Sequence, residues 1–568
     1  MEKIIECVPN YSEGRDRAVI GAIVDAIASV DGVKVLNVDP GEATNRTVVT
    51  FVGAPEHVVE AAFRGSRKAQ ELIDMRRHHG AHPRSGATDV LPLVPVSGIT
   101  LEECAVLARE LAERLFRELG IPCYCYEAAA FRPERKNLAV CRAGEYEALP
   151  EKFADPERRP DFCGAWDAVA ERCGATNVGA RNFLVAVNFN LNTTSTRRAM
   201  AVAFDVREKG RKAREGGSLT GKLLKDGNGE QIWIPGTLKG CKAIGWYIDE
   251  YGIAQVSMNI TDINATPLHV AYEEVSRAAA ARGLRVTGAE IVGLVPKKVL
   301  MDAGKFYLEK QQRSLGISDD EIMKIAVKSM SLDDLRPFNP HEKVIEYLME
   351  DPQQQALKER LVRMTLKGFA DETASESPAP GGGSISAYMG ALGAALGTMV
   401  ANLSAHKRGW DDRWKEFSEW AEKGQGIMKE LVGLVDEDTA AFDRIMAAFG
   451  LPKGTDEEKA ARAEAIEEAT LYASQVPLRT MKASFKVFEV ARAMATEGNP
   501  NSVSDAGVGA LAARSAVLGA CLNVKINAVG LKDKEKAATL IAEAEGIAAK
   551  TVEEEKEILD IVNSKING

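Results

Sequence analysis

Long hydrophobic runs are missing from this sequence of 568 residues. A membrane-spanning helix needs roughly 20 consecutive apolar residues, and no uninterrupted run of even about eighteen occurs. The first residues, MEKIIECVPNYSEG, also lack the basic segment followed by an apolar one that is typical of a secretion signal. We therefore expect no membrane partner and a cytoplasmic location.

Excess positive charge is also missing. Lys and Arg together number 72 and Asp and Glu 82, so the formal net charge is -10. A chain with this balance has no broad positive field to attract a phosphate backbone, which argues against a nucleic-acid partner. The nine cysteines are few and odd in number. This count favours reduced thiols over a disulfide framework.

The first third of the chain alternates short strands with amphipathic helices, and its length allows several domains. Runs rich in Val, Ile and Thr predict strands at KIIECV, VKVLNVD and RTVVTFVG, and a later strand at PCYCYEA. Helical spacing predicts helices over residues 16–29, 55–73 and 101–119, the last ended by Gly120.

A similar order restarts at Arg181, with the strand NFLVAVNFNL, a helix near 195–209, two strands around Tyr251–Gly252 and a helix over 267–281. Each repeat brings an asparagine to the end of its first strand, Asn10 and Asn188. We predict two related α/β subdomains of the ferredoxin-like βαββαβ type, over 1–180 and 181–335. A cleft between two such sheets is a natural ligand site, so both asparagines are candidate substrate-binding residues.

The composition changes after RPFNPHE (336–342), where Ala, Glu, Lys and Met become frequent and strand-like alternation ends. Helical spacing predicts helices over 343–371, 384–405, 413–449, 456–496, 502–528 and 532–564. Small residues at helical spacing suit close helix packing. We therefore predict an all-helical bundle domain over 336–568.

The segment 209–240 is polar and rich in glycine, which predicts a surface excursion. Within it, GGSLTGK (216–222) nearly spells a phosphate-binding loop. Leu223 stands where such a loop has Ser or Thr, and a charged helix end rather than a strand precedes it. We therefore expect no bound nucleotide.

The stretch HHGAHPRSG (78–86) holds three of the seven histidines. His78 and His82 are four residues apart, a spacing used for zinc on a helix, but glycines and a proline interrupt any helix here. An imidazole on such a loop suits proton transfer near neutral pH. A pair of surface histidines in a turn is the alternative.

Two aspartates are candidates for acid–base work. Asp39 ends the strand before Pro40–Gly41, where it either orients an imidazole or caps the turn. Asp438, in GLVDEDTAAF, is aligned with apolar residues four positions away on both sides. A carboxylate on an inward face is costly unless it is paired or functional, and a solvated acidic face is the alternative.

The stretch APGGGS (379–384) opens a helix. Backbone amides of a glycine loop at a helix N-terminus suit a carboxylate or phosphate. Gly381, Gly382, Gly383 and Ser384 are therefore candidate substrate-binding residues, and a tight N-cap with Ser384 as the capping residue is the alternative.

Longer motifs run through both halves: ECVPNYSEG, ATNRTVVTFVG, HHGAHPRSGATDVLP, RAGEYEALPEK, KAIGWYIDE, EIVGLVP, APGGGS and LVDEDTAAF. Together they resemble the formimidoyltransferase-cyclodeaminase family of bifunctional folate enzymes. The resemblance runs from about Glu2 to beyond Asn523. Residues up to about Arg336 resemble the glutamate formimidoyltransferase, and the remainder resembles the formimidoyltetrahydrofolate cyclodeaminase.

The resemblance implies two successive reactions of histidine degradation. The formimidoyl group of N-formimidoyl-L-glutamate passes to tetrahydrofolate, and the 5-formimidoyltetrahydrofolate then closes to 5,10-methenyltetrahydrofolate with release of ammonia. It further implies that His82 is the transferase histidine and Asp438 the cyclodeaminase aspartate. The folate-binding segment falls between Cys163 and Gly174 and includes Gly164.

For this chemistry we expect His82 to remove the proton of the folate nitrogen, Asp39 to orient its ring and Arg84 to anchor a carboxylate. Asp438 delivers a proton to the departing amine. Neither step needs a metal or a nucleotide, so tetrahydrofolate, with a polyglutamate tail, is the expected carrier. Basic residues that could hold this tail are Lys297, Lys298, Lys407 and Arg408, surface solvation being the alternative for each.

Other functions fit parts of the pattern. A folate-dependent transferase could use N-formylglutamate or a related one-carbon donor, with the helical half serving mainly in assembly. A metal-dependent hydrolase would use His78, His79 and His82. Because members of the resembled family associate, we also expect a homo-oligomer.

Overall fold

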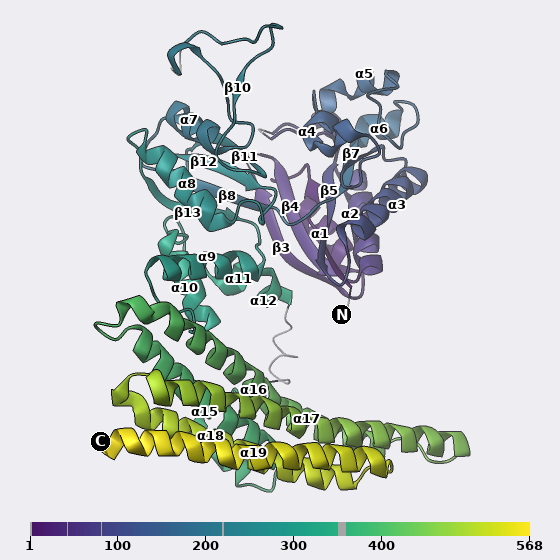
Figure 1. The fold of residues 1–568 in the computed structure, drawn as a ribbon. Coiled ribbons are helices and arrows are strands. Elements are labelled where there is room, and N and C mark those ends of the chain that lie inside the picture. Colours follow the sequence, from purple (N-terminus) through teal and green to yellow (C-terminus); the bar gives the residue numbers. More distant parts are fainter. Residues whose placement is uncertain (1–2, 43, 81, 218–220, 350–358, 568) are drawn as a thin grey trace. The chain divides into compact units, whose positions relative to one another are not determined.

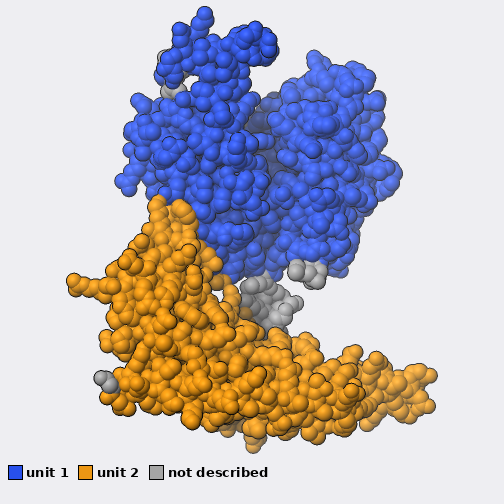
Figure 2. All heavy atoms as spheres, in the orientation of Figure 1, with its two compact units in different colours: residues 1–303, 330–349 blue, residues 304–329, 350–568 orange. Residues whose placement is uncertain are grey.

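The computed structural model describes residues 3–42, 44–80, 82–217, 221–349 and 359–567. The chain divides into two compact units, 1–303 with 330–349 and 304–329 with 350–568 (Figure 2). The first unit is mixed α/β and the second is helical (Figure 1). The predicted change from α/β to all-helical structure along the chain is therefore confirmed.

The first sheet of the α/β unit has seven strands. They are β1 (Ile4–Cys7), β2 (Asn10–Tyr11), β3 (Val33–Gly41), β4 (Arg46–Gly53), β5 (Thr88–Ser97), β6 (Cys123–Glu127) and β7 (Thr176–Ala180). β1 and β2 follow one another between β4 and β5, and β3 forms the edge beside β4, all antiparallel. β7 and β6 extend the sheet in parallel beyond β5.

Three helices of this region, α1 (Arg17–Ala28), α2 (Pro55–Leu72) and α3 (Leu101–Leu119), lie within a residue of their predicted bounds at each end. Their ends follow from local chemistry. The Asp16 side chain caps α1, a Thr100–Glu103 capping box starts α3, and Gly120 ends α3 with φ 70°.

Strand alternation separates the two faces of the first sheet. Ile5, Cys7 and Phe51 are fully buried in the hydrophobic core that includes residues of the three helices. The intervening positions are polar: Glu6 on β1, Asp39 on β3 and Arg46 on β4. The face opposite the helices is therefore a polar surface.

Short elements just before β5 and between β5 and β7 were not predicted. They are η1 (Met75–Arg77), η2 (Pro133–Lys136), α4 (Leu138–Cys141), η3 (Tyr146–Ala148), α5 (Leu149–Ala154) and α6 (Ala168–Cys173). Each has six residues or fewer, too short for a helical period to stand out in the sequence.

The second sheet repeats the strand order of the first. It consists of β8 (Val185–Leu191), β11 (Cys241–Ile248), β12 (Ile253–Ile260) and β13 (Val286–Val292), in the antiparallel order β11-β12-β8-β13. Helix α7 (Thr196–Val206) connects β8 to the excursion, and α8 (Leu268–Ala280) connects β12 to β13. This order of strands and helices repeats that of the first subdomain, as predicted.

The predicted excursion over 209–240 is a mostly exposed segment with a two-stranded ribbon, β9 (Arg211–Lys212) and β10 (Trp233–Ile234) (Figure 1). A short turn, η4 (Glu215–Gly217), follows β9. Residues 218–220 of the GGSLTGK motif lie outside the described residues.

The predicted continuous helix over 343–371 is wrong. Helix α11 (Pro340–Lys343) ends where Val344 becomes extended. The Val295 amide donates to the Lys343 carbonyl, and the Ile345 amide donates to the Val295 carbonyl. Helices α12 (Ile345–Met349) and α14 (Leu366–Thr373) follow separately, while residues 350–358 lie outside the described residues. A tertiary contact thus overrides the helical spacing.

Helix α9 (Lys297–Lys310) begins in the first unit and ends in the second, and α10 (Asp319–Ser329) belongs to the second. Residues 304–329 pack with the helical unit, where the Leu315 amide donates to Ser418 Oγ at 2.9 Å and Asn402 donates to the Gly316 carbonyl at 2.9 Å.

The five long bundle helices match their predicted ranges closely. They are α15 (Gly382–Ala405), α16 (Trp414–Phe449), α17 (Asp456–Glu497), α18 (Val503–Val529) and α19 (Lys534–Asn567). By length and composition, α15 and the stretch 500–529 could cross a membrane, but 61% and 50% of their apolar windows are buried within the protein. Their small apolar residues pack against neighbouring helices, as Gly393 does against Gly509.

Candidate active sites

A cavity of about 830 Å³ opens on the polar face of the first sheet. Its walls come from both α/β subdomains: Asn10, Asp39 and His82 from the first, Lys242 and Asn259 from the second. The predicted ligand cleft between two sheets is therefore present, and it contains three of the predicted site residues.

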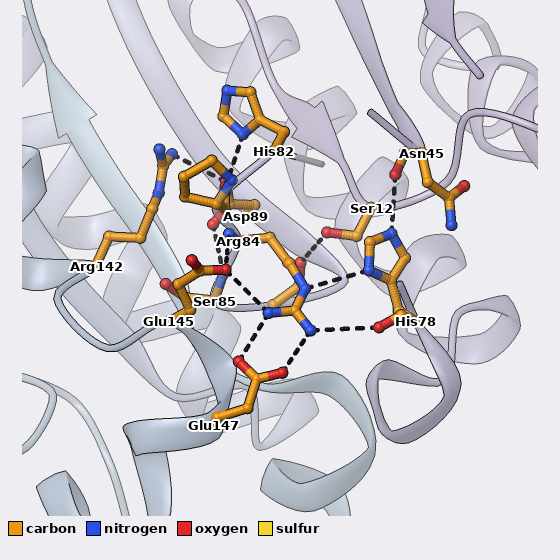
Figure 3. A network of polar contacts seen from close by, with 12 residues as sticks. Ser12, Asn45, His78, His82, Arg84, Ser85, Asp89, Arg142, Glu145 and Glu147 are labelled. Atoms are coloured by element: carbon orange, nitrogen blue, oxygen red, sulfur yellow. Dashed lines mark hydrogen bonds and ion pairs between the residues drawn. The ribbon is translucent and has the colours of Figure 1, made fainter. Parts of the chain in front are cut away.

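The histidine loop 78–86 is held at several points. Ser12 Oγ donates to the Gly86 carbonyl at 2.7 Å, and the Ser85 amide donates to Asp89 at 2.8 Å (Figure 3). Asn45 Nδ2 donates to the His79 carbonyl at 3.1 Å. These bonds fix the loop from which His82 enters the cavity.

His82 is half-buried in the cavity wall. Its Nδ1 lies 2.7 Å from the Pro83 carbonyl, which only accepts, so Nδ1 carries the proton and Nε2 is left as the basic nitrogen. Burial, reinforced by the nearby Arg46 and Arg142, lowers the pKa of His82 to about 4. The ring is therefore neutral at physiological pH and ready to accept a proton.

A buried ion cluster lies next to His82. Asp89 is fully buried and accepts from Arg46 and, at 2.9 Å, from Arg142. Arg46 Nε also donates to Asn10 Oδ1 at 3.0 Å, so the predicted Asn10 holds an arginine of the cavity wall. Arg46, Asp89 and Arg142 were not predicted as site residues. Arg46 and Asp89 could have been noticed in the sequence as polar residues within otherwise apolar strands. No sequence pattern pointed to Arg142.

Asp39 lines the same cavity as His82 but is exposed on β3. The Nδ1 atom that an orienting carboxylate would hold is bonded to the Pro83 carbonyl instead. The structure therefore brings Asp39 to the site without the predicted orienting contact.

Arg84 is not in the cavity wall, which corrects its prediction as a carboxylate anchor. Its guanidinium is buried and paired with Glu145 at 3.1 Å and Glu147 at 2.6 Å. In Figure 3 this cluster lies away from the His82 ring, with Arg84 Nε 3.3 Å from His78 Nδ1. These internal partners leave the guanidinium no free edge for a substrate.

The histidines are not arranged around a metal. His78 Nε2 lies 2.8 Å from the Asn45 carbonyl, and its Nδ1 accepts from Arg84. Among the described residues, no group of three His, Cys, Asp or Glu side chains is placed to hold a metal ion. All nine cysteines are unpaired, and eight of them are buried.

The predicted folate segment lies outside the wall of this cavity, which includes neither Cys163, Gly164 nor Gly174. Gly174 has φ 70°, and a Cβ there would lie 2.1 Å from the Ser85 carbonyl oxygen. Glycine is required because this residue packs against the end of the histidine loop. Asn188 is also outside the wall and donates to Glu290 at 3.3 Å.

The second site joins the start of α15 to the middle of α16. Asp438 of α16 lies directly against Gly383, where a Cβ would approach its Oδ1 to 2.1 Å. Ser384 Oγ lies 3.2 Å from Asp438 Oδ2 and donates to the Val435 carbonyl at 2.8 Å. Gly381, not Ser384, is the N-cap of α15. The predicted glycine loop and the predicted aspartate therefore meet, 54 residues apart from Ser384 to Asp438 in sequence.

Burial raises the pKa of Asp438, and the hydroxyl and amide of Ser384 oppose this shift. Its two acidic neighbours have other partners. Glu437 accepts from Tyr472 at 2.6 Å and pairs with Arg479 at 2.5 Å. Asp436 accepts from the amides of Leu361 and Val362 at 2.7 and 3.2 Å. The pKa of Asp438 is therefore raised, whereas Tyr472 and Arg479 lower the pKa of Glu437.

Three family models match consecutive parts of the chain. The formiminotransferase domain, N-terminal subdomain, matches residues 4–181, the formiminotransferase domain matches 186–350, and formiminotransferase-cyclodeaminase matches 365–546. These spans place the His82 cavity in the first two models and Asp438 in the third.

Named relatives cover the whole chain and each half. The formimidoyltransferase-cyclodeaminase of Gallus gallus is 42% identical over 535 residues, 94% of each chain. The glutamate formimidoyltransferase of Streptococcus pyogenes serotype M1 is 40% identical over 309 residues, 54% of this chain and 94% of its own. The methenyltetrahydrofolate cyclohydrolase of Methylorubrum extorquens is 42% identical over 203 residues, 36% of this chain and 98% of its own. The chain therefore belongs to the formimidoyltransferase-cyclodeaminase family.

Proposed function

We propose that the two sites divide the two reactions of the family between them. The chain transfers the formimidoyl group from N-formimidoyl-L-glutamate to tetrahydrofolate and then converts the product to 5,10-methenyltetrahydrofolate and ammonia. We assign the transfer to the cavity that contains His82, and the cyclodeamination to the site of Asp438.

In the transfer, nitrogen 5 of tetrahydrofolate attacks the formimidoyl carbon, and the glutamate nitrogen leaves. A base must remove the proton from the attacking nitrogen. The neutral His82 with its free Nε2 in the cavity wall is the observation that carries this assignment. In the tetrahedral intermediate the bond from the formimidoyl carbon to nitrogen 5 has formed. The intermediate collapses when the bond to the glutamate nitrogen breaks and the amine leaves with a proton.

Three cations of the cavity wall replace Arg84 as anchors for carboxylates. They are Lys136, Arg181 and Lys242. Both substrates carry the carboxylates of glutamate, which pair with such groups through charge-assisted hydrogen bonds. Asn10 supports this wall through Arg46, and Asp39 lies at its exposed part.

In the second reaction, nitrogen 10 of the folate attacks the formimidoyl carbon, closes a five-membered ring and displaces ammonia. The departing nitrogen needs a proton, and a carboxyl of raised pKa is suited to deliver it. Asp438, seated on Gly383 and Ser384, fits this role. The relative that matches this half is named a methenyltetrahydrofolate cyclohydrolase, which supports a folate with a one-carbon ring as a reactant or product at this site.

We propose further that both α/β subdomains are of the ferredoxin-like type, because both have the βαββαβ element order and corresponding antiparallel strand neighbours. The domains proposed are 1–180, 181–335 and 336–568, in line with the spans of the family models. The segments Cys163–Gly174 and Gly381–Ser384 remain proposed folate contacts, with Asn188 supporting the second sheet.

The carrier proposed is tetrahydrofolate with a polyglutamate tail, without metal or nucleotide. Lys297, Lys298, Lys407 and Arg408 are the surface cations proposed for the tail. A cytoplasmic homo-oligomer completes the proposal.

Purified protein given N-formimidoyl-L-glutamate and tetrahydrofolate tests the assignment through the absorbance of the methenyl product. His82→Ala should slow transfer by roughly 10²- to 10⁴-fold, the usual contribution of a general base. Asp438→Ala should leave transfer intact and let 5-formimidoyltetrahydrofolate accumulate without ammonia. Unchanged rates in either variant would refute the role of that residue.

A further inference from the structure

Glu6 is a buried carboxylate in the wall of the transferase cavity. It lies on β1 between Ile5 and Cys7, which point into the core, so its own side chain points to the cavity face. The residue is only 4% exposed. Within the described part of the chain, no hydrogen bond or ion pair to its carboxylate is found.

An unpaired buried carboxylate is costly, because burial removes the water that stabilises its charge. Burial raises the pKa of Glu6 to about 7, against the attraction of Arg181. The other two carboxylates of the cavity wall differ. Asp39 is exposed to solvent. Glu127 is half-buried and has Lys242 and Lys136 nearby in addition to Arg181, which attracts both glutamates. Glu6 is thus the cavity carboxylate best placed for a cationic ligand group.

The formimidoyl group supplies such a cation. It is an amidine, and amidines are protonated in neutral water, so the group carries one positive charge over two nitrogens with N–H donors in one plane. A carboxylate can accept from both nitrogens at once, as it does from a guanidinium. A formyl group in the same position offers a neutral carbonyl oxygen, which accepts hydrogen bonds and repels a carboxylate.

We propose that the Glu6 carboxylate binds the formamidinium group of N-formimidoyl-L-glutamate and thereby selects this donor over its formyl analogue. The inference rests on the proposed use of this cavity for transfer. Binding of the cation keeps Glu6 ionised and satisfies a carboxylate that otherwise has no partner. Glu6 is then a specificity residue, whereas His82 is the base.

The test compares full-length wild type with Glu6→Gln, Glu6→Asp and, as a surface control, Glu102→Gln, which lies exposed in the first turn of α3. Dissociation constants are measured by calorimetry, without folate, for N-formimidoyl-L-glutamate and for N-formyl-L-glutamate. Transfer to tetrahydrofolate is measured in parallel, so that failure of the proposed function is seen separately as absence of transfer in wild type.

Glu6→Gln should weaken binding of the formimidoyl ligand by roughly 10- to 100-fold, the range for a lost charge-assisted hydrogen bond. Binding of the formyl ligand should be unchanged or tighter, and Glu6→Asp should recover part of the preference. The melting temperature of Glu6→Gln should not fall, because the variant removes an unpaired buried charge. Equal weakening of both ligands, no change for either, no binding of the formimidoyl ligand by wild type, or a marked loss of stability would overturn the proposal.

Discussion

At the scale of single residues, the proposed transferase site contains a histidine that its surroundings keep neutral. Burial and two arginines disfavour the charged form of His82, while the Pro83 carbonyl holds the proton on Nδ1. The result is a base that is available without first losing a proton. The lowered pKa of His82 also reduces the stability of the folded protein at acidic pH.

The sign of that dependence follows from linkage. The pKa of His82 falls from 6.5 in the unfolded chain to about 4 in the folded protein. Between these values the unfolded chain binds more protons, so this residue makes the folded protein less stable as pH falls through that window. At pH above 6.5 the penalty is absent.

Modification by diethyl pyrocarbonate tests the titration of His82 directly, because the reagent attacks neutral imidazole. We expect His82, identified by peptide mass spectrometry, to keep its reactivity from pH 7.5 to pH 5.5, while free N-acetylhistidine loses most of its own. The midpoint of the His82 rate should lie near pH 4. A midpoint near 6.5 would show that the cavity does not shift the pKa.

At the scale of elements, the proposed cyclodeaminase site depends on the close approach of two helices. The first turn of α15 presents Gly383 without a side chain, and this gap is where α16 places Asp438. A side chain at this position would collide with the Asp438 carboxylate, which accounts for the glycine. The α15–α16 packing thereby sets the position of the carboxylate.

Gly383→Ala should therefore abolish ammonia release while transfer continues. The new methyl group would lie 2.1 Å from Asp438 Oδ1 and must displace it. We expect a loss of roughly 100-fold or more, comparable with removal of a general acid. The rate is followed by ammonia release from 5-formimidoyltetrahydrofolate.

The matched control is Gly433→Ala on α16 itself, where nothing lies within 4 Å of the new methyl group. This exposed helical position should gain about 0.5–1 kcal/mol of stability with normal activity. If both alanine variants release ammonia normally, the contact between Gly383 and Asp438 does not position the acid.

At the scale of the whole molecule, each proposed site lies in its own compact unit. Among the described residues, those that line the cavity of His82 belong to the α/β unit, and those that contact Asp438 belong to the helical unit. Relatives that match one half alone agree with this separation. Loss of one site should therefore leave the other intact.

Mixing two inactive full-length variants tests this independence. Neither His82→Ala nor Asp438→Asn should form methenyltetrahydrofolate alone, but an equimolar mixture should form it after a lag. The lag arises because 5-formimidoyltetrahydrofolate made by one protein must diffuse to the other. Adding purified 5-formimidoyltetrahydrofolate to His82→Ala should remove the lag, whereas a mixture without product would show that the sites depend on each other within one chain.

The sequence by itself determined the order of elements, because strand alternation, helical spacing and capping residues are local properties. It therefore predicted α1 to α3, the repeated α/β order and the five bundle helices. The motifs also identified His82 and Asp438 as candidates. Short elements and the break at Val344 escaped it, since a long-range pairing with Val295 decides the conformation there.

Only the tertiary structure decided which side chains share a site. It placed Arg84 in an internal ion cluster and brought Arg46, Asp89 and Arg142 to His82. It also placed Glu6 in the cavity wall. The physical reason is that burial, partners and pKa depend on residues distant in sequence. The spacing of residues in the sequence predicts on which face of a helix or strand a side chain lies. Only tertiary packing determines which residues it contacts there.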